Sequence, residues 1–159
     1  IEKNNITEKS IWEIFTNGLE IFNKEDRLPY DKLETEIRNV MTTDVSIVRD
    51  KDKLNHAIEK LSEIDEKILL NNLEDIRTFV ELKSMVVSSL AVAKAALIRE
   101  ESRGSHYRSD FPEKSGQWQK HIVLCYKNRQ FEYEIENVAQ VSDKLKEYLQ
   151  LSINKTDNN

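Results

Sequence analysis

The fold is decided by residues 73–104, which read LEDIRTFVELKSMVVSSLAVAKAALIREESRG. This stretch has no proline, its only glycine is the last residue, and apolar side chains return every three or four positions. It therefore predicts one helix from about Leu73 to Ser102, on the order of 45 Å long at a rise of 1.5 Å per residue. Gly104 is expected to end this helix in the left-handed conformation.

The second half of the predicted helix, from Met85 to Ile98, is apolar or small on almost every side. A helix that is apolar all round has to be covered all round. Two interpretations follow from this pattern. The helix is either the central helix of its own bundle, or it also packs against polypeptide outside this chain.

The segments upstream of this helix show the same periodicity and predict three shorter helices. Asp31 is expected to cap the second of them, because Glu34 follows three residues later in a capping-box arrangement. Asp50 is expected to begin the third, which leads to a turn at residues 71–72. The three predicted helices span about residues 8–23, 31–45 and 50–70.

Downstream of Gly104 the pattern changes from helix to strand. Residues 121–126 and 131–135 are rich in β-branched and aromatic side chains, with polar residues between them, which predicts a hairpin over 119–138. Within this hairpin Cys125 is expected to point inward. A C-terminal helix over 142–151 and a disordered tail over 154–159 follow.

The predicted fold class is therefore mainly α. It consists of a spectrin-repeat-like bundle of three to four long helices, followed by a small β-hairpin and a C-terminal helix. We expect the chain to form a single domain over 1–159, with the bundle over 8–103 and a motif loop over 103–118.

Charge and composition exclude several classes of partner. The 159 residues carry 24 basic and 29 acidic side chains, interspersed, for a net charge of −5, so nucleic acid and anionic membranes are not expected partners. No apolar run reaches the ~20 residues of a membrane span, and no secretory signal is present. With a single cysteine, Cys125, we predict a cytoplasmic chain. Because it begins at Ile1, we interpret it as part of a longer polypeptide or as a trimmed chain.

The functional information is concentrated in residues 99–121, REESRGSHYRSDFPEKSGQWQKH, which we call the motif segment. It holds two of the three glycines, two of the three histidines and one of the two tryptophans. A loop so rich in arginine is expected to hold something in a fixed geometry. The candidate residues of this interdomain or structural motif are Glu101, Arg103, Gly104, His106, Arg108, Asp110, Phe111, Pro112, Trp118 and His121.

Two catalytic interpretations of the motif segment are weak. His106, Asp110 and His121 are metal ligands by type, but their spacing matches no established zinc pattern. Ser102 or Ser105 beside His106 would supply a nucleophile and a base, but sequence neighbours rarely form a triad. The chain also has no glycine-rich phosphate loop. We therefore expect no metal, no cofactor and no catalytic residue within this chain.

Arg103 and Arg108 leave two further interpretations. They could clamp an anionic ligand, because guanidinium groups fork onto carboxylates and phosphates. Alternatively they pair with Glu100, Glu101 and Asp110 and fix the loop. The second arrangement is the more ordinary one, and it is the one we expect.

The motif segment also carries a family resemblance. Residues 99–112, REESRGSHYRSDFP, followed by WQKH at 118–121, resemble the C-terminal helical domain of the succinate dehydrogenase, fumarate reductase and L-aspartate oxidase flavoproteins. The resemblance extends upstream to residues 36–41 and 45–49. It covers about residues 30–138.

The chain departs from this family at two places. Ser105 stands where the family usually has alanine or glycine, and residues 114–116 replace an acidic pair that is common after the Asp-Phe-Pro motif. Among the family members, the runs at 45–49 and 105–112 resemble L-aspartate oxidase more than the others.

The resemblance implies what the parent protein does. It would bind FAD in a separate Rossmann-like domain, with a capping domain over the active site, and would move a hydride between a C4 dicarboxylate and the flavin. In the aspartate oxidases, L-aspartate becomes iminosuccinate, which feeds NAD synthesis. The family's catalytic residues lie in the flavin and capping domains, so this domain would support the flavin domain without catalysing. The competing hypothesis is a free-standing helical module whose long helix docks a protein partner.

Overall fold

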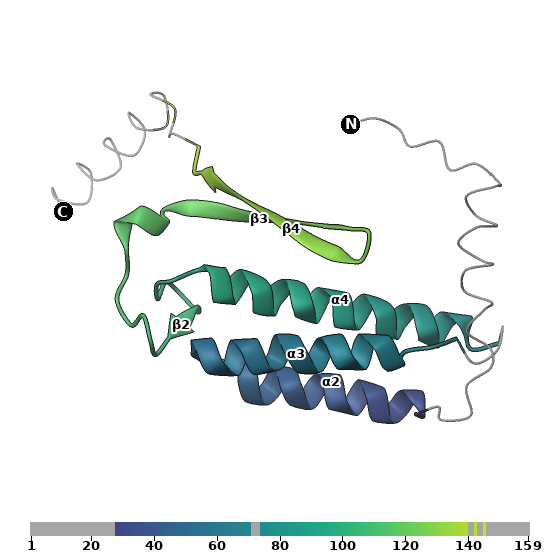
Figure 1. Cartoon of the computed structure of the whole chain (residues 1–159). Coiled ribbons are helices and arrows are strands. Elements are labelled where there is room, and N and C mark those ends of the chain that lie inside the picture. The colour runs from purple at the N-terminus through teal and green to yellow at the C-terminus, as the bar shows by residue number, and fades with distance from the viewer. Residues whose placement is uncertain (1–27, 71–73, 140–141, 143–144, 146–159) are drawn as a thin grey trace, which may run out of the picture. The chain divides into compact units, whose positions relative to one another are not determined.

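The computed structural model describes residues 28–70, 74–139, 142 and 145 of the chain. It confirms the mainly α fold class with a small β-hairpin (Figure 1). The helices are α2 (Tyr30–Asp44), α3 (Lys51–Lys67) and α4 (Ile76–Ile98), and a 3₁₀ turn spans Gly116–Trp118. The strands are β1 (Val48–Arg49), β2 (Tyr107–Arg108), β3 (Lys120–Lys127) and β4 (Gln130–Asn137).

Four of the predicted segments lie outside the described residues. They are the first helix over 8–23, the turn at 71–72, the tail over 154–159 and, apart from Ser142 and Leu145, the C-terminal helix over 142–151.

The chain divides into two compact units. The first unit runs to Ser115 and holds the three helices with β1 and β2, and the second begins at Gly116 and holds β3 and β4. The boundary lies inside the predicted motif loop over 103–118, where the sequence predicted one continuous domain over 1–159.

The helices of the first unit begin close to the predicted positions. Asp50 caps α3 as expected, because its side chain accepts a hydrogen bond of 2.9 Å from the backbone amide of Lys53. The capping prediction for α2 is wrong. Pro29 occupies the cap position and its carbonyl accepts from the amides of Lys32 and Leu33, so Asp31 lies inside the first turn of the helix.

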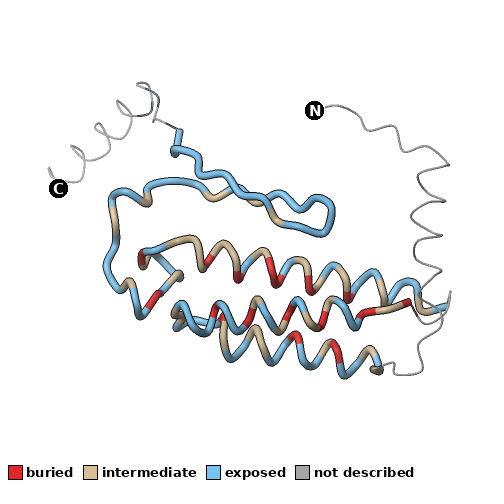
Figure 2. Tube along the Cα trace, viewed as in Figure 1, coloured by how far each residue is buried: buried red, intermediate tan, exposed pale blue. Residues whose placement is uncertain are grey.

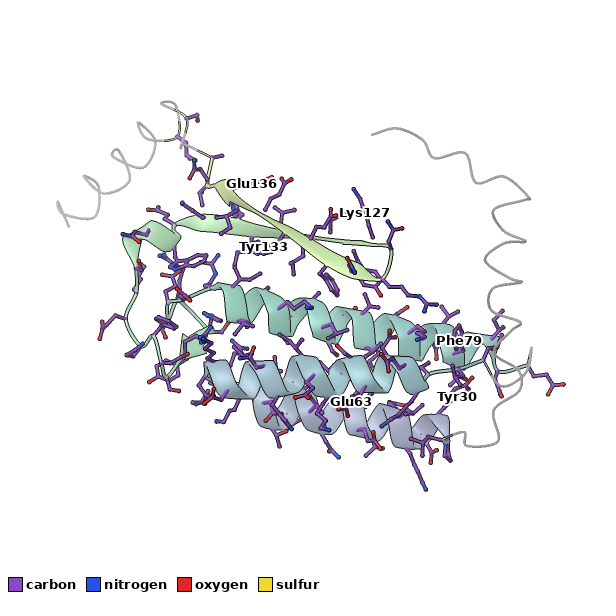
Figure 3. The ribbon with its side chains drawn as sticks, viewed as in Figure 1. Tyr30, Glu63, Phe79, Lys127, Tyr133 and Glu136 are labelled. Carbon is purple, nitrogen blue, oxygen red and sulfur yellow. The ribbon has the colours of Figure 1, made fainter. Side chains whose placement is uncertain are left out.

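The core of the first unit lies between the three helices, whose buried residues face one another (Figure 2). At one end, Tyr30 donates its hydroxyl hydrogen to the carbonyl of Leu69 over 2.7 Å, which ties the start of α2 to the segment after α3 (Figure 3). At the other end, alanines from α3 and α4 meet Val45, so the backbones approach closely. The buried helix residues include Leu33, Ile37, Leu54, Ala57, Leu61, Ile64, Leu82, Val86, Leu90, Ala93 and Ala96.

Helix α4 differs from the prediction at its end and on one face. It ends at Ile98, so Gly104 does not terminate it, although Gly104 does adopt a positive φ of 59°. Val80 and Val92 of α4 remain 53% and 48% exposed. The described residues of the first unit therefore leave this face of α4 uncovered. Among the described helices, none combines the length and the apolar character that crossing a bilayer requires.

The second unit confirms the predicted hairpin. Strands β3 and β4 pair antiparallel, and the connecting residues Asn128 and Arg129 both have positive φ, 50° and 61°, which is the pattern of a type I′ turn. The predicted orientation of Cys125 is wrong, because its side chain is exposed. The register instead puts the apolar pairs on the opposite face, where Ile122 lies across from Ile135 and Leu124 across from Tyr133.

Candidate functional site

The motif segment is placed by the parallel pairing of β1 with β2. Val48 lies opposite Tyr107 and Arg49 opposite Arg108. Because side chains alternate along a strand, the two arginines share one face and turn inward, and Arg108 is only 1% exposed. The motif segment thereby reaches the place where α4 ends and α3 begins.

A tight turn at residues 103–106 prepares this placement. The backbone amide of Arg103 donates to the carbonyl of His106 over 2.8 Å, and the amide of His106 donates back over 3.0 Å. Gly104 is the only one of the two central residues with a positive φ, which is the pattern of a type II′ turn. The positive φ of Gly104, predicted at a helix end, therefore belongs to this turn.

Arg108 closes the end of α4. Its Nη1 donates to the carbonyls of Ala96, Leu97 and Arg99 at 2.8, 3.0 and 3.3 Å. These carbonyls are among those that a helix leaves without partners at its C-terminus, where the helix dipole also favours a cation. The same guanidinium binds Asp110 through two bonds, from Nε at 2.7 Å and from Nη2 at 2.6 Å.

Asp110 carries the connection on to α3. Its Oδ2 accepts a hydrogen bond of 3.1 Å from the backbone amide of Lys51, the first residue of that helix. The hydrogen bonds from Arg108 are the main reason that the pKa of the Asp110 carboxyl falls to about 2. One ion pair therefore joins the carbonyl end of α4 to the amide end of α3.

Glu101 forms a second centre beside the first. Its side chain is completely buried and accepts from Arg103 at 2.7 and 3.1 Å and from Arg99 at 2.8 Å. The backbone amide of Ser115 adds a fourth bond at 2.9 Å. The hydrogen bonds from Arg103 contribute most to lowering the pKa of Glu101 to about 2, so its carboxylate is charged at neutral pH.

His106 lies between arginines and is held in its neutral form. Its Nδ1 is 3.2 Å from Nη1 of Arg49, and its Nε2 is 3.3 Å from the carbonyl of Arg99. Because a guanidinium can only donate, Nδ1 accepts from Arg49 and the ring proton resides on Nε2. Burial is the main reason that the pKa of this imidazole is lowered.

The predicted site residues divide between the two units. Glu101, Arg103, His106, Arg108 and Asp110 come together in the first unit, and we call them the arginine clasp. Phe111 lies beside them with its ring centre 5.0 Å from the guanidinium carbon of Arg108, and Pro112 is exposed. Trp118, in the 3₁₀ turn, and His121, on β3, belong to the second unit.

The contacts answer the alternative interpretations of the motif segment. Ser102 accepts from the amide of Arg108 and donates to the carbonyl of Phe111, and His106 contacts neither Ser102 nor Ser105 in the hydrogen bonds described above, so no serine–histidine pair forms. Among the described residues, no group of three potential metal-ligating side chains is present.

The arginines of the clasp bind carboxylates of their own loop, as the second interpretation expected. Within the described part of the chain, every buried side-chain nitrogen and oxygen has a hydrogen-bond partner. The clasp is therefore built to fix the geometry of two helix ends. Sequence reasoning missed Arg49, the amide of Lys51 and Ser115 as members of this network. For Arg49 the sequence carried two signals, the family resemblance over residues 45–49 and the apolar residues before Arg49, which are typical of a strand.

Comparisons with known proteins identify the family. The model of the family described as fumarate reductase flavoprotein C-term matches residues 34–152. This chain belongs to that family. The curated relatives are similar to it over most of its length but over a small part of their own, so the chain spans about a fifth of the length of these relatives.

Three relatives illustrate the range of the family. An FAD-dependent oxidoreductase of Methanocaldococcus jannaschii is 42% identical over 112 residues, which cover 69% of this chain and 21% of the relative. A CoM/CoB fumarate reductase subunit of Methanothermobacter marburgensis is 36% identical over 108 residues, 64% of this chain and 19% of the relative. The L-aspartate oxidase of Acinetobacter baylyi is 32% identical over 91 residues, 55% of this chain and 16% of the relative.

Solved structures share the fold. FrdA of the Escherichia coli quinol fumarate reductase superimposes with a TM-score of 0.75 at 19% identity, over 89% of this chain and 26% of that one. Sdh1 of Mycobacterium smegmatis gives a TM-score of 0.75 at 23% identity, over 95% of this chain and 28% of that one. The family's C-terminal domain therefore has the fold described here.

Proposed function

We propose that the parent protein is an FAD-dependent oxidoreductase acting on a C4 dicarboxylate or on L-aspartate, and that this chain supports its flavin domain. The observation that carries the supporting role is the arginine clasp, whose charged groups bind one another and two helix ends. A site that receives a substrate or a cofactor needs polar groups directed at the ligand. The clasp directs its groups inward, at the fold itself.

We assign FAD to polypeptide outside this chain. The three glycines of the chain lie far apart, so they cannot form the loop that cradles a dinucleotide phosphate. The cations of the clasp are engaged by Glu101 and Asp110. The residues of this chain therefore do not fit the flavin, and no step of the reaction is assigned to them.

The names of the relatives support the proposed substrate class. Their names include fumarate reductase, succinate dehydrogenase and L-aspartate oxidase. The identity to the methanogen fumarate reductase, 36%, exceeds the identity to the L-aspartate oxidase, 32%. We therefore propose both activities, the oxidation or reduction of a C4 dicarboxylate and the oxidation of L-aspartate. The cytoplasmic location stays a prediction.

The contact with the flavin domain would use the exposed side of α4. Val80 and Val92 lie on the part of α4 that the described residues of the first unit leave open, and Ser84 and Ser88 lie between them at four-residue spacing. A stripe of small and apolar side chains, on a helix that is already packed on its other side, is suited to a second packing partner.

The test compares the full reading frame with this chain alone. We expect the full polypeptide to retain FAD, measured by its absorbance after gel filtration, and to oxidise L-aspartate or succinate or to reduce fumarate. This chain alone should do neither. Stoichiometric FAD bound to this chain alone would overturn the assignment. A reading frame with no FAD-binding segment upstream would favour the free-standing helical module instead.

A second measurement tests the role of α4 in the full polypeptide. Replacing Val80 and Val92 together by aspartate should accelerate the release of FAD, because buried charges weaken the packing against the flavin domain. Asn55→Asp is the matched control, because it adds a charge at an exposed position of α3.

A further inference from the structure

The neutral imidazole of His106 connects two segments that lie far apart in the chain. Its Nδ1 accepts from Nη1 of Arg49 over 3.2 Å, and its Nε2 donates to the carbonyl of Arg99 over 3.3 Å. Arg49 belongs to β1 and is 57 residues away from His106 in the sequence. The bond between these two side chains therefore ties β1 to the motif segment. We call it the histidine latch.

A second bond holds Arg49 on the other side of the latch. Its Nε donates to the carbonyl of Val45 over 2.9 Å, and Val45 is the C-terminal cap residue of α2. A cation is favourable at this position, because the carbonyl end of a helix carries partial negative charge. Arg49 therefore belongs with the end of α2, whereas His106 belongs with the end of α4.

The latch matters because the strand pair next to it is short. Strands β1 and β2 contain two residues each, so few backbone hydrogen bonds hold them together. One such bond runs from the amide of Ser109 to the carbonyl of Arg49 over 2.8 Å. A hydrogen bond from a charged donor is stronger than one between neutral groups, so the latch is a substantial part of the connection between β1 and the motif segment.

Protonation of His106 removes the acceptor on which the latch depends. A guanidinium has only donors, and an imidazolium has a donor on both ring nitrogens. Once Nδ1 takes up a proton from the solvent, two N–H groups and two positive charges face each other where the bond of 3.2 Å was. The attraction between Arg49 and His106 is then replaced by repulsion.

The surroundings of His106 oppose the added charge. The charged groups that act most strongly on the imidazole are Arg49 from β1, Arg108 from β2 and Arg99 from the end of α4, and all three are cations. Each of them disfavours a proton on Nδ1 as long as the latch is closed. The proton is therefore bound more readily when Arg49 and His106 separate, and by linkage a low pH favours the separated form.

The carboxylates of this region bind other partners and do not depend on the latch. Glu101 binds Arg103, Asp110 binds Arg108, and Asp50 caps α3. The pKa values of Glu101 and Asp110 are both about 2, so these two carboxylates stay charged at pH 5. Their ion pairs therefore persist under conditions in which an ordinary histidine is protonated.

We propose that His106 is an acid-sensitive latch, whose protonation detaches β1 from the motif segment while the ion pairs of the arginine clasp continue to hold the end of α4 to the start of α3. The change is a local opening and not the unfolding of the unit, because the helices keep their core and the two carboxylates keep their arginines. The inference concerns contacts within the first unit and does not depend on the proposed function.

Amide hydrogen exchange, followed by NMR in the whole 159-residue chain, measures the three contacts separately. The amide of Ser109 reports on β1, that of Lys51 on the contact with Asp110, and that of Ser115 on the contact with Glu101. Between pH 7.5 and pH 5 the protection factor of Ser109, corrected for the intrinsic effect of pH on exchange, should fall about tenfold. The protection factors of Lys51 and Ser115 should not change.

His106→Asn is the matched variant, because its side-chain oxygen accepts from Arg49 but does not titrate. In this variant Ser109 should be equally protected at both pH values. The ring nitrogens of His106 in the wild type give a second measurement that needs no substitution. Their NMR shifts should show the proton on Nε2 at pH 7.5, and the imidazolium should form over the same pH range in which Ser109 loses protection.

Four results would overturn the inference. An equal loss of protection at Ser109, Lys51 and Ser115 would mean that the clasp opens as a whole. Unchanged protection of Ser109 at pH 5 would mean that the latch does not hold β1. An equal loss in His106→Asn would assign the effect to another group. A proton on Nδ1 of His106 at pH 7.5 would mean that the latch does not exist.

Discussion

Arg108 is a cation with 1% of its surface exposed, and such a group is tolerated only when every donor is satisfied. Its Nε and Nη2 bind Asp110, while its Nη1 binds carbonyls at the end of α4. The planar fork of arginine makes both sets of bonds at once. A lysine has the same charge but presents a single nitrogen, so it cannot replace this geometry.

We therefore expect Arg108→Lys to reduce the free energy of unfolding by about 3 kcal/mol, since one partner of a buried network is lost. Urea unfolding of this chain measures the change. The control is Arg38→Lys, because Arg38 forms an exposed pair with Glu34 on α2, for which a change below about 0.5 kcal/mol is expected. Equal effects of the two substitutions would contradict this account of the clasp.

His106 predicts the pH dependence of stability. Burial lowers the pKa of its imidazole in the fold, whereas the unfolded chain has the ordinary value of about 6.5. Below that value the unfolded chain binds more protons than the folded one, so stability falls as the pH decreases. His106→Asn keeps an acceptor for Arg49 but does not titrate, and it should flatten this loss.

The slope of the free energy of unfolding against pH is measured by urea unfolding between about pH 7.5 and pH 5, the range in which an ordinary histidine titrates. Asn55→Gln is the control, because Asn55 is exposed on α3 and neither side chain titrates. It should retain the wild-type slope. A wild-type slope in His106→Asn as well would show that another group is responsible.

Individual contacts of the clasp were predictable only where the partners are close in sequence. The pairs Arg103–Glu101 and Arg108–Asp110 are each two residues apart, so composition and proximity sufficed. The contacts of Arg49 with His106 and of Lys51 with Asp110 span 57 and 59 residues. These contacts depend on how the helices are arranged, which a local pattern does not contain.

Helix ends and strand faces were likewise predictable only where the residue that decides them lies nearby in the sequence. The start of α3 was predicted because Asp50 caps it from the adjacent position. The end of α4 was not, because Arg108, well beyond Ile98 in the chain, supplies the donor for its last carbonyls. Cys125 was assigned to the wrong face because the deciding apolar residues lie across the register on β4.

The hairpin of the second unit carries a removable strain. Arg129 has a φ of 61°, in the left-handed region that costs a side chain of this kind about 1 kcal/mol. Asn-Gly is the preferred sequence for such a turn. We expect Arg129→Gly to stabilise the hairpin by about 0.5–1 kcal/mol, since the gain exceeds the added flexibility of the unfolded chain.

Hydrogen exchange of the β3 and β4 amides measures this gain, which should appear as slower exchange. Arg129→Ala is the matched control, because it removes the side chain but keeps the β-carbon. It should not slow exchange. A gain with alanine as large as with glycine would indicate that the charge of Arg129, and not its backbone conformation, was unfavourable.

The whole molecule consists of two compact units, and the clasp marks the end of the first. Ser115 is the last residue of that unit, and its amide binds Glu101 while its carbonyl accepts from Arg103. A chain ending after Gln117 keeps both bonds. We therefore expect its helices to melt within a few degrees of the full chain.

A chain ending after Lys114 keeps the Glu113 carbonyl that accepts from the amide of Ser102 but removes the two bonds of Ser115. It should melt roughly 5 °C or more lower, because a buried carboxylate loses a donor. Circular-dichroism melting curves of the two shortened chains make the comparison. If the two chains melted at the same temperature, the two bonds of Ser115 would contribute nothing to the stability of the first unit. Loss of helix in the longer one would show that the first unit depends on the second.

The parallel pairing of β1 with β2 has a mechanical consequence. It joins segments far apart in the chain, so α3 and α4 lie within a loop that the pair closes. Tension entering through α2 and leaving after Ser109 pulls the two strands at opposite ends, and the load falls on all their hydrogen bonds together as shear. In optical tweezers we expect α3 and α4 to stay folded until this closure ruptures, and then to extend in a single step.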